Sequence, residues 1–396
     1  MSYKKVYLKP GKEESLKRFH PWVFSGAIAK IEGEPEEGEV VDVYTSKKEF
    51  IACGHYQIGS IAVRVLSFVQ ETIDREFWKR RLGVALDLRR SLDLVDNPQN
   101  NTCRLVHGEG DNLPGLVIDI YGDTAVVQAH SVGMHYAKDV IAELLVEIIP
   151  AVNNVYYKSE GTMPFKAPVK PVDGYLIGDK TETIALENGL KFHANWLDGQ
   201  KTGFFVDQRD NRSLLEHYAK GRNVLNMFCY TGGFSLYALR GGAQRVDSVD
   251  VSQKAIDLVN INVARNFPQC DCHTAVTQDA FDYLREKHTS GLSYDLIILD
   301  PPAFAKHRDA IRNALRGYQR INAKAIEMIK PGGILFTFSC SQAIDKEMFR
   351  LAVFSAAAQV GRKVRILHQL HQPQDHPINI YHPEGEYLKG LVVYVE

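Results

Sequence analysis

Three acidic residues and one cysteine in the second half of the sequence each follow a short apolar run. Asp250 closes "SVD", Asp279 stands in "VTQDAFDYL", Asp300 opens "DPPAF", and Cys340 follows "GGILFTFS". If these runs are strands of one parallel sheet, the four side chains meet at its carboxyl edge, where such sheets bind ligands. Asp250 is then placed to accept hydrogen bonds from ribose hydroxyls of an adenine nucleoside, and Asp279 from the adenine amino group. Each carboxylate could instead cap a helix N-terminus.

Paired glycines follow the first of these runs, in "NVLNMFCYTGGFSLYALRGGAQ". Because Gly232 and Gly233 have no side chain, the backbone can approach a ligand there while the next helix presents its N-terminus. The G-x-G-x-x-G fingerprint of NAD-dependent dehydrogenases is absent, which argues against that class of enzyme.

Two prolines restrict the backbone directly after the fourth run. Pro301 and Pro302 are predicted to form a rigid shelf, with Asp300 in front and the aromatic Phe304 behind. Such a shelf suits a flat nitrogen heterocycle, which could stack on the ring while polar groups read its edge. A tight turn between strand and helix is the alternative interpretation.

Cys340 also has two interpretations, as a small apolar side chain of the core or as a nucleophile at the mouth of a site. A nucleophilic cysteine must reach the thiolate form at neutral pH, and a cationic neighbour favours that form. The sequence identifies no His or Lys neighbour of Cys340.

The spacing of the apolar runs predicts the elements that position these residues. In the second half of the chain, "NVLNMF", "RVDSVD", "CHTAV", "YDLIILD" and "GGILFTFS" alternate with helical stretches. This alternation is typical of a parallel sheet with helices on both faces. We therefore predict an α/β domain over residues 191–396.

Two smaller domains are predicted before it, because 396 residues are too many for one ordinary core. Residues 1–70 contain short β runs punctuated by glycines, which indicates a small β-roll. Residues 71–190 combine helical periodicity near 73–90 and 134–148 with several strands, which is typical of an α+β fold.

Composition narrows the possible functions. No apolar run approaches the length of a membrane-spanning helix and "MSYKKVYLKPGKEE" lacks the apolar core of a signal peptide, so we expect a cytoplasmic protein. The six cysteines are scattered, as expected for thiols in a reducing compartment. "CDCH" at 270–273 has no second ligand pair at zinc-like spacing, so we expect no metal.

The net charge of −1 conceals two basic regions. Residues 1–30 carry seven Lys or Arg against two Glu. In a predicted helix after the shelf, basic residues recur every fourth position and form one stripe: Arg308, Arg312, Arg316, Arg320 and Lys324. The stripe could neutralise phosphates of a nucleic acid or be an ordinary solvated face.

In their order and spacing, "VLNMFCYTGGFSL", "SVDVS", "LDPPAF" and "FTFSCS" resemble the S-adenosylmethionine-dependent RNA methyltransferases, most closely the ribosomal RNA large subunit methyltransferase I family. The resemblance covers the whole chain, since "VYLKPGKEESLKRFHPWVFSGAI" is similar to a PUA domain. It implies an α/β fold with a Rossmann-like class I methyltransferase domain over 191–396, a PUA-like RNA-binding β-roll over 1–70 and an α+β middle domain over 71–190. It also implies S-adenosylmethionine as the cofactor and 23S rRNA as the partner.

The resemblance further implies roles for individual residues. "TGFFVDQRDNR" matches a family segment that lies over the cofactor. The cofactor-binding residues so implied are Phe205, Asp207, Gln208, Arg209, Phe228, Tyr230, Thr231, Gly232, Gly233, Asp250, Asp279 and Asp300. The RNA-contacting residues are Pro301, Pro302, Phe304, Arg312, Arg316 and Arg320. The T-G-G sequence differs from the G-x-G-x-G of many methyltransferases but is familiar in this group.

The family makes 5-methylcytosine, and carbon 5 of cytosine cannot attack a sulfonium methyl group unaided. A thiolate must first add to carbon 6. The resemblance implies that Cys340 is this nucleophile and that Asp300 binds the cytosine edge. Ala303 stands where other RNA cytosine-C5 methyltransferases carry a cysteine that assists release, so the sequence does not identify the releasing base.

Two other functions stay open at this point. An acid followed by Pro-Pro and an aromatic residue also suits methylation of an exocyclic amine, which needs no cysteine. A non-catalytic RNA-binding assembly factor would keep the cofactor pocket without turnover. Cys340 separates the first alternative from carbon 5 chemistry, and turnover separates the second.

Overall fold

The computed structural model describes residues 3–164, 167–305 and 308–396. The chain forms two compact units, each assembled from separate segments. The first unit comprises Met1–Gly189, Ala194–Val206 and Gln374–Gly385, and the second comprises Leu190–His193, Asp207–Pro373 and Glu386–Glu396.

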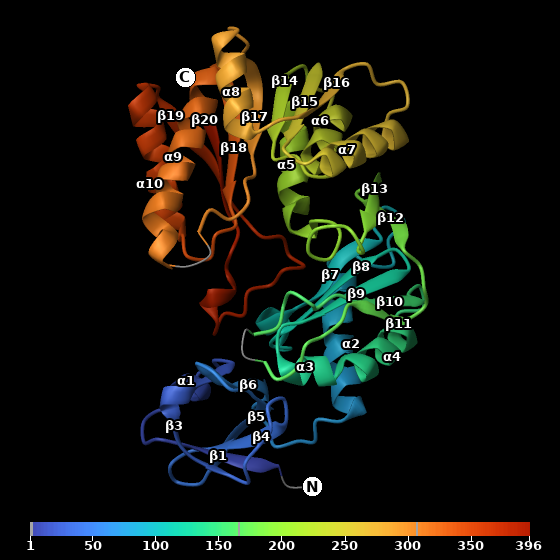
Figure 1. The fold of residues 1–396 in the computed structure, drawn as a ribbon, viewed down its shortest axis with the longest axis vertical. Helices are drawn as coiled ribbons and strands as arrows, with labels where there is room; N and C mark the ends of the chain where they lie inside the picture. The colour runs from blue at the N-terminus through green and yellow to red at the C-terminus, as the bar shows by residue number, and fades with distance from the viewer. Residues whose placement is uncertain (1–2, 165–166, 306–307) are drawn as a thin grey trace. The chain divides into compact units, whose positions relative to one another are not determined.

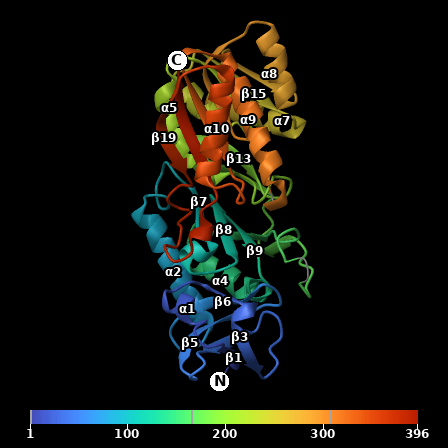
Figure 2. The same cartoon turned by 90° about the vertical axis from the view of Figure 1, so that its left-hand side faces the viewer.

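The first sheet of the first unit has the order β2-β6-β5-β4-β1-β3 and is drawn in blue in Figures 1 and 2. Its strands are β1 (Lys4–Leu8), β2 (Trp22–Phe24), β3 (Ile28–Glu32), β4 (Val40–Tyr44), β5 (Phe50–Tyr56) and β6 (Ile61–Ser67), with helix α1 (Glu14–Lys17) after β1. Only β1 and β4 pair in parallel. Alternate residues such as Val41 and Val43 fill a common core with Val6, Leu8 and Val63. The predicted β-roll is confirmed.

A second sheet of the first unit, in the order β11-β10-β9-β8-β7, packs with helices. Its elements are α2 (Arg75–Ser91), β7 (Thr102–His107), β8 (Leu116–Tyr121), β9 (Thr124–Ala129), α3 (Val132–Tyr136), α4 (Lys138–Ile148), β10 (Asn154–Tyr157) and β11 (Gly174–Ile177), followed along the chain by β12 (Glu182–Glu187) and β13 (Leu190–Asn195). Helix α2 begins after Asp74, whose carboxylate accepts a hydrogen bond from the Phe77 N–H at 3.0 Å. The helix predicted near 73–90 is confirmed as α2, whereas the one predicted near 134–148 is divided into α3 and α4; the apolar faces of these helices meet the sheet.

Buried ion pairs hold the later segments of the first unit together. Arg89, which is completely buried, pairs with Asp111 and donates to the Asp375 carbonyl oxygen at 2.7 Å. Arg104 pairs with Asp119 through two hydrogen bonds of 2.8 and 2.9 Å, and its backbone N–H donates to the Asp375 carboxylate. The segment Gln374–Gly385 is therefore fastened to the first unit although it follows most of the second in sequence.

The second unit contains a seven-stranded sheet in the order β16-β15-β14-β17-β18-β20-β19. Its strands are β14 (Asn223–Met227), β15 (Arg245–Asp250), β16 (His273–Thr277), β17 (Tyr294–Leu299), β18 (Ile329–Ser339), β19 (Val364–His371) and β20 (Lys389–Val395). The first five strands along the order are parallel, as predicted, whereas β20 pairs antiparallel with both β18 and β19. The sheet is therefore mixed, with β20 running against the other six strands, and neither β19 nor β20 was predicted.

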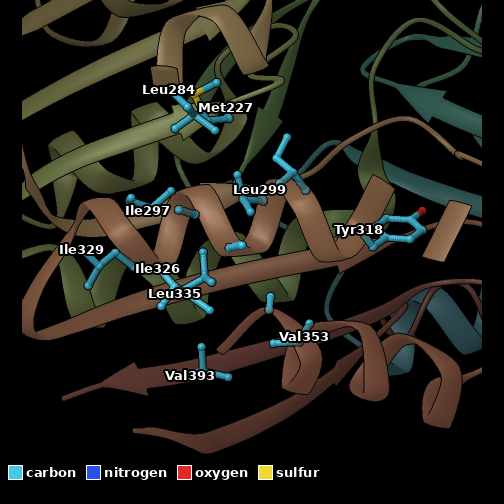
Figure 3. Close-up of a cluster of buried hydrophobic side chains, with 14 of the residues drawn as sticks. Met227, Leu284, Ile297, Leu299, Tyr318, Ile326, Ile329, Leu335, Val353 and Val393 are labelled. Carbon is cyan, nitrogen blue, oxygen red and sulfur yellow. The ribbon is translucent and has the colours of Figure 1, made fainter. Parts of the chain in front are cut away.

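Helices cover both faces of this sheet, as Figure 1 shows. They are α5 (Arg209–Ala219), α6 (Gly233–Arg240), α7 (Gln253–Asn266), α8 (Ala280–Thr289), α9 (Ile311–Met328) and α10 (Lys346–Val360). Alternate strand residues point to opposite faces, so Leu225 and Met227 join a core with α8, α9 and α10, while Val224 joins one with α5 and α6. Figure 3 shows part of the larger core, in which Leu299 and Tyr318 lie between strands and helix α9.

Two features are absent from the described residues. No helix within 3–164, 167–305 and 308–396 is long and apolar enough to cross a membrane. The same ranges contain no group of three or more His, Cys, Asp or Glu side chains arranged to hold a metal ion.

Candidate active site

The strand order of the second unit reverses beside β14, which lies between β15 and β17. Parallel sheets bind ligands beyond the carboxyl ends of the strands at such a point. Many of the predicted site residues lie at the ends of β14, β15, β17 and β18 or in the loops that follow them. The fold therefore gathers at one edge the residues that the sequence scatters over more than a hundred positions.

The loop after β14 has an unusual backbone. Phe228 and Tyr230 have φ angles of +57° and +46°, and Gly232, which caps helix α6, has +81°. Non-glycine residues rarely adopt positive φ, and such strain concentrates at binding sites. Thr231 between them is buried, and its carbonyl oxygen accepts a hydrogen bond from Asn262 at 2.9 Å. All four loop residues belong to the predicted cofactor site.

Asp250 fixes this loop from the end of β15. Its Oδ2 accepts a hydrogen bond from the Tyr230 N–H at 3.0 Å, and its Oδ1 accepts one from the Ser252 N–H at 2.9 Å. Each carboxylate oxygen has two acceptor positions, so each retains one for a ligand. Ser252, and not Asp250, caps helix α7. The helix-cap alternative for Asp250 is therefore wrong.

Asp279 does cap its helix. Its Oδ1 accepts hydrogen bonds from the Phe281 and Asp282 N–H groups at 2.9 and 3.1 Å. The side chain is exposed, and its Oδ2 accepts no hydrogen bond within the described part of the chain. A capping role and a second role toward a ligand are compatible, and the second stays a prediction.

Asp300 is linked to the segment before helix α5. It accepts a hydrogen bond from Gln208 Nε2 at 3.1 Å, and Gln208 Oε1 accepts one from Asn211 Nδ2 at 2.6 Å. Tyr387, just before β20, donates its hydroxyl to Asp207 at 2.7 Å. The structure thus brings Asp207, Gln208 and Asp300 together, although more than ninety residues separate the first two from the third in sequence.

The remaining predicted cofactor residues differ in their surroundings. Arg209 is buried at the start of α5. A Cβ atom on Gly233 would stand 2.9 Å from Cδ of Arg212, so any larger residue there would require the Arg212 side chain to shift. Phe205 belongs to the first unit, where its half-buried ring lies 5.2 Å from Lys201 Nζ.

The Pro-Pro shelf lies beside Cys340, as predicted. Cys340 Sγ is 4.0 Å from the carbonyl oxygen of Pro301, and the thiol is half-buried. Pro301 is buried and Pro302 exposed. The ring of Phe304 lies 4.7 Å from that of Tyr318, so part of its surface already packs against helix α9. The shelf and the cysteine form one local arrangement.

A buried lysine beside Cys340 was missed by the sequence analysis. Lys389 opens β20 opposite Ser339 and is 4 % exposed. Its Nζ donates to the carbonyl oxygens of Ser341 at 2.6 Å and Tyr387 at 2.7 Å. The signal in the sequence was a lysine at the start of the apolar run "GLVVYV".

The arginine stripe occupies one exposed side of helix α9. Arg312, Arg316 and Arg320 are exposed, and Arg320 lies over the ring of Phe281 at 5.1 Å. Neither Arg312 nor Arg316 forms an ion pair with any residue that the structure describes. The side chain of Arg308 lies outside the described part, so the stripe is followed from Arg312 onward.

Comparison with known proteins shows the family of this chain. A PUA-like domain family matches residues 6–68, and the S-adenosylmethionine-dependent methyltransferase family matches residues 168–382. Ribosomal RNA large subunit methyltransferase I of Pseudoalteromonas translucida is 42 % identical over 391 residues, which cover 98 % of each chain. The protein of the same name from Aeromonas hydrophila is 40 % identical over 393 residues, again 98 % of each chain. The chain belongs to the ribosomal RNA large subunit methyltransferase I family.

Solved structures support the fold of this family member. A structure described as a SAM-dependent methyltransferase from Streptococcus mutans has a TM-score of 0.83 at 23 % identity, with 100 % of both chains covered. Another, described as a methyltransferase complexed with SAH, has a TM-score of 0.85 at the same identity and coverage. The predicted class I fold, the PUA-like domain and the S-adenosylmethionine-dependent methyltransferase domain are confirmed.

Proposed function

We propose that this protein methylates carbon 5 of a cytosine in 23S ribosomal RNA and that Cys340 forms a covalent adduct with the base. The observation that carries the proposal is the half-buried Cys340 thiol at the end of β18, 4.0 Å from the Pro301 carbonyl oxygen of the shelf. The names of the relatives, which act on large-subunit ribosomal RNA, support the substrate.

The residues at the strand ends suit S-adenosylmethionine. The strained loop at Phe228 and Tyr230 brings backbone close to a ligand, and Asp250 keeps an acceptor position on each oxygen for ribose hydroxyls. Asp279 is proposed to accept a hydrogen bond from the adenine amino group. Asp207, Gln208 and Asp300 lie at the same carboxyl edge of the sheet. When bound, the cofactor supplies an electrophilic methyl group.

Cys340 makes the cytosine reactive. Its thiolate adds to carbon 6, so that an S–C bond forms and the electron pair of the 5,6 double bond moves toward N3 and makes carbon 5 nucleophilic. After methylation of carbon 5, loss of the carbon 5 proton restores the double bond as the S–C bond breaks. Asp300 holds the cytosine edge through N3 or the exocyclic amine.

RNA binding is proposed for two surfaces. The PUA-like sheet of residues 6–68 supplies one. Arg312, Arg316 and Arg320 supply phosphate contacts on α9, while Pro301, Pro302 and Phe304 contact the target base. The division into domains at 1–70, 71–190 and 191–396 is part of this proposal.

A trapping experiment tests the chemistry. The protein is incubated with S-adenosylmethionine and 23S rRNA containing 5-fluorocytidine, and adducts are resolved on a denaturing gel. Because fluorine at carbon 5 cannot leave as a proton, the wild-type protein is expected to stay attached to the RNA. Cys340→Ala is expected to abolish the adduct.

Cys272→Ala serves as the matched control, since Cys272 is equally half-buried but lies before β16. It should keep the adduct. If unmodified rRNA is methylated while no adduct forms, the proposal is wrong and methylation of an exocyclic amine replaces it. If the protein binds cofactor and rRNA without any methyl transfer, it is a non-catalytic binding protein.

A further inference from the structure

A nucleophilic thiol needs a source of positive charge, and the second unit contains one at the right place. Lys389 pairs in register with Ser339, the residue before Cys340, across the β18–β20 ladder. Its Nζ also donates to the carbonyl oxygen of Ser341, the residue after Cys340, at 2.6 Å. The lysine backbone is thus fixed beside Ser339, and its ammonium group is held at the residue that follows the cysteine.

The surroundings of Lys389 are unusual for a charged side chain. It is 4 % exposed, and no carboxylate pairs with it among the described residues. Its two hydrogen-bond partners are carbonyl oxygens, so one of its three donor positions is uncommitted. A buried ammonium without a counter-ion is costly, which indicates that another group compensates it.

The titratable and charged groups around Lys389 point to the thiol as that group. They are Cys340, Asp345, Lys346, Glu386, Tyr318 and Tyr387. Burial lowers the pKa of Lys389 to about 8, and among the groups that oppose this shift Cys340 has the largest effect, ahead of Glu386 and Asp345. Glu386 is already paired with Lys346 at 2.5 Å.

Tyr318 does not compete for the role of anion. Its hydroxyl is hydrogen-bonded at 2.9 Å to both Ser339 and Ser341, and burial raises its pKa, so it stays neutral. Asp345 caps helix α10, where its carboxylate accepts a hydrogen bond from the Met348 N–H at 2.8 Å, and it acts on Lys389 less strongly than Cys340 does. Among these groups the Cys340 thiolate is therefore the best partner for the lysine.

We propose that Lys389 is the positioning residue that generates and holds the Cys340 thiolate. The neutral amine takes the thiol proton, so that the S–H bond breaks, an N–H bond forms and the electron pair stays on sulfur for attack. The ammonium remains beside the sulfur and stabilises it again when it leaves the base. This inference rests on the proposed nucleophilic function of Cys340.

The test measures Cys340 without any RNA. Full-length protein is alkylated with iodoacetamide between pH 6 and 10, and the rate at Cys340 is read by mass spectrometry of its peptide. For the wild type, we expect the midpoint of the pH profile below about 8.5, the value of an ordinary thiol. For Lys389→Met, we expect the midpoint to rise by at least about one unit and the rate at pH 7 to fall about tenfold.

Two further variants keep the test decisive. Lys389→Arg retains the charge and should keep the midpoint low, whereas Lys330→Met, which removes a half-exposed lysine paired with Asp295 at the other end of β18, should match the wild type. A wild-type midpoint at or above 8.5, or one unchanged in a folded Lys389→Met, overturns the inference. Should Lys389→Met not fold, the wild-type and Lys389→Arg profiles decide.

The outcome is separable from that of the trapping experiment. A normal 5-fluorocytidine adduct together with Lys389-independent alkylation rejects only the role of Lys389. Lys389-dependent alkylation without an adduct leaves the ion pair intact and rejects the proposed function.

Discussion

The buried ion pairs of the first unit and the strand-end carboxylates of the second unit are held by different kinds of partner. In the first unit, Arg89 and Asp111 are almost inaccessible and satisfy each other, and Arg104 and Asp119 do the same with two-pronged geometry. The hydrogen-bonding groups of these side chains are used within the protein, so little capacity is left for a ligand.

In the second unit, the carboxylates at the strand ends are held by weaker donors. Asp250 accepts only backbone N–H groups, and Asp279 does likewise. Backbone donors orient a carboxylate without neutralising it, so its charge and remaining lone pairs stay available. The comparison teaches that these strand-end acids keep acceptor positions for a ligand because backbone N–H groups hold them, whereas Asp111 and Asp119 are used up in structural pairs with arginines.

The largest expected effect comes from breaking a buried pair. Arg89→Met leaves Asp111 buried without its partner and should lower the free energy of unfolding of the first unit by about 3–5 kcal/mol. Urea denaturation followed by tryptophan fluorescence measures this unit specifically, because all three tryptophans belong to it: Trp22, Trp78 and Trp196.

Arg90→Met is the matched control for this experiment. Arg90 is the next residue of α2, but it is exposed and pairs with Asp96 on the surface. Its removal should cost less than about 1 kcal/mol. Equal losses in the two variants would contradict the structural role of the buried pair.

Acid should weaken the first unit through a neutral histidine. Burial, followed by the charge of Arg64, lowers the pKa of His55 to about 4 from 6.5, and its ring packs on Trp78 and Gly133. Between these pH values the unfolded chain binds the proton and the folded one does not. Stability is therefore complete above pH 6.5 and falls as the pH drops toward 4, by up to about 3 kcal/mol.

Unfolding experiments from pH 7.5 to 4 on wild type and His55→Gln would measure this contribution. The variant should lose correspondingly less stability on acidification. His288→Gln, which changes an exposed histidine of α8, should follow the wild type. An identical acid profile for His55→Gln would show that His55 does not set the response.

A smaller effect is expected when the charge at the candidate cofactor site is removed. Asp250→Asn keeps the size of the side chain but loses charge-assisted hydrogen bonds, so S-adenosylmethionine should bind about 10- to 100-fold more weakly by calorimetry. Asp257→Asn, on the exposed side of α7, should leave the affinity unchanged. Unchanged binding by Asp250→Asn would remove it from the proposed site.

The smallest effect concerns the arginine stripe. Arg316→Ala should reduce the slope of log affinity for rRNA against log salt concentration by about 1. Arg285→Ala, an exposed arginine of α8 that pairs with Asp282, should leave the slope as it is. Equal slopes for Arg316→Ala and wild type would make the stripe an ordinary solvated face.

Local sequence signals sufficed for the parallel part of the sheet. Short apolar runs followed by Asp250, Asp300 or Cys340 gave the five parallel strands and the edge where their ends meet. The prolines predicted a rigid shelf, and the parallel order of the strands placed it beside Cys340, in agreement with the distance from Sγ to the Pro301 carbonyl oxygen. Each of these signals is a short run of residues at the end of one strand.

What escaped prediction depends on distant pairing or on backbone angles. Strand β19 has mostly exposed or half-exposed residues, so its sequence has no continuous apolar run. Lys389 comes close to Cys340 only through the register of β20 on β18. The positive φ angles of Phe228 and Tyr230 cannot be predicted from their residue types. Asp279 could be a cap or a ligand from sequence alone, since one carboxylate can serve as both.

The path of the chain limits how this protein can be divided. After Pro373 the chain leaves the second unit for Gln374–Gly385 and returns at Glu386 to insert β20 between β18 and β19. A fragment cut at Pro373 would expose an unpaired edge on β18 and deprive β19 of the strand it pairs with. A stable catalytic fragment therefore has to join Asp207–Pro373 to Glu386–Glu396 through a designed linker, and exchange of the whole first unit between relatives requires cuts at several positions.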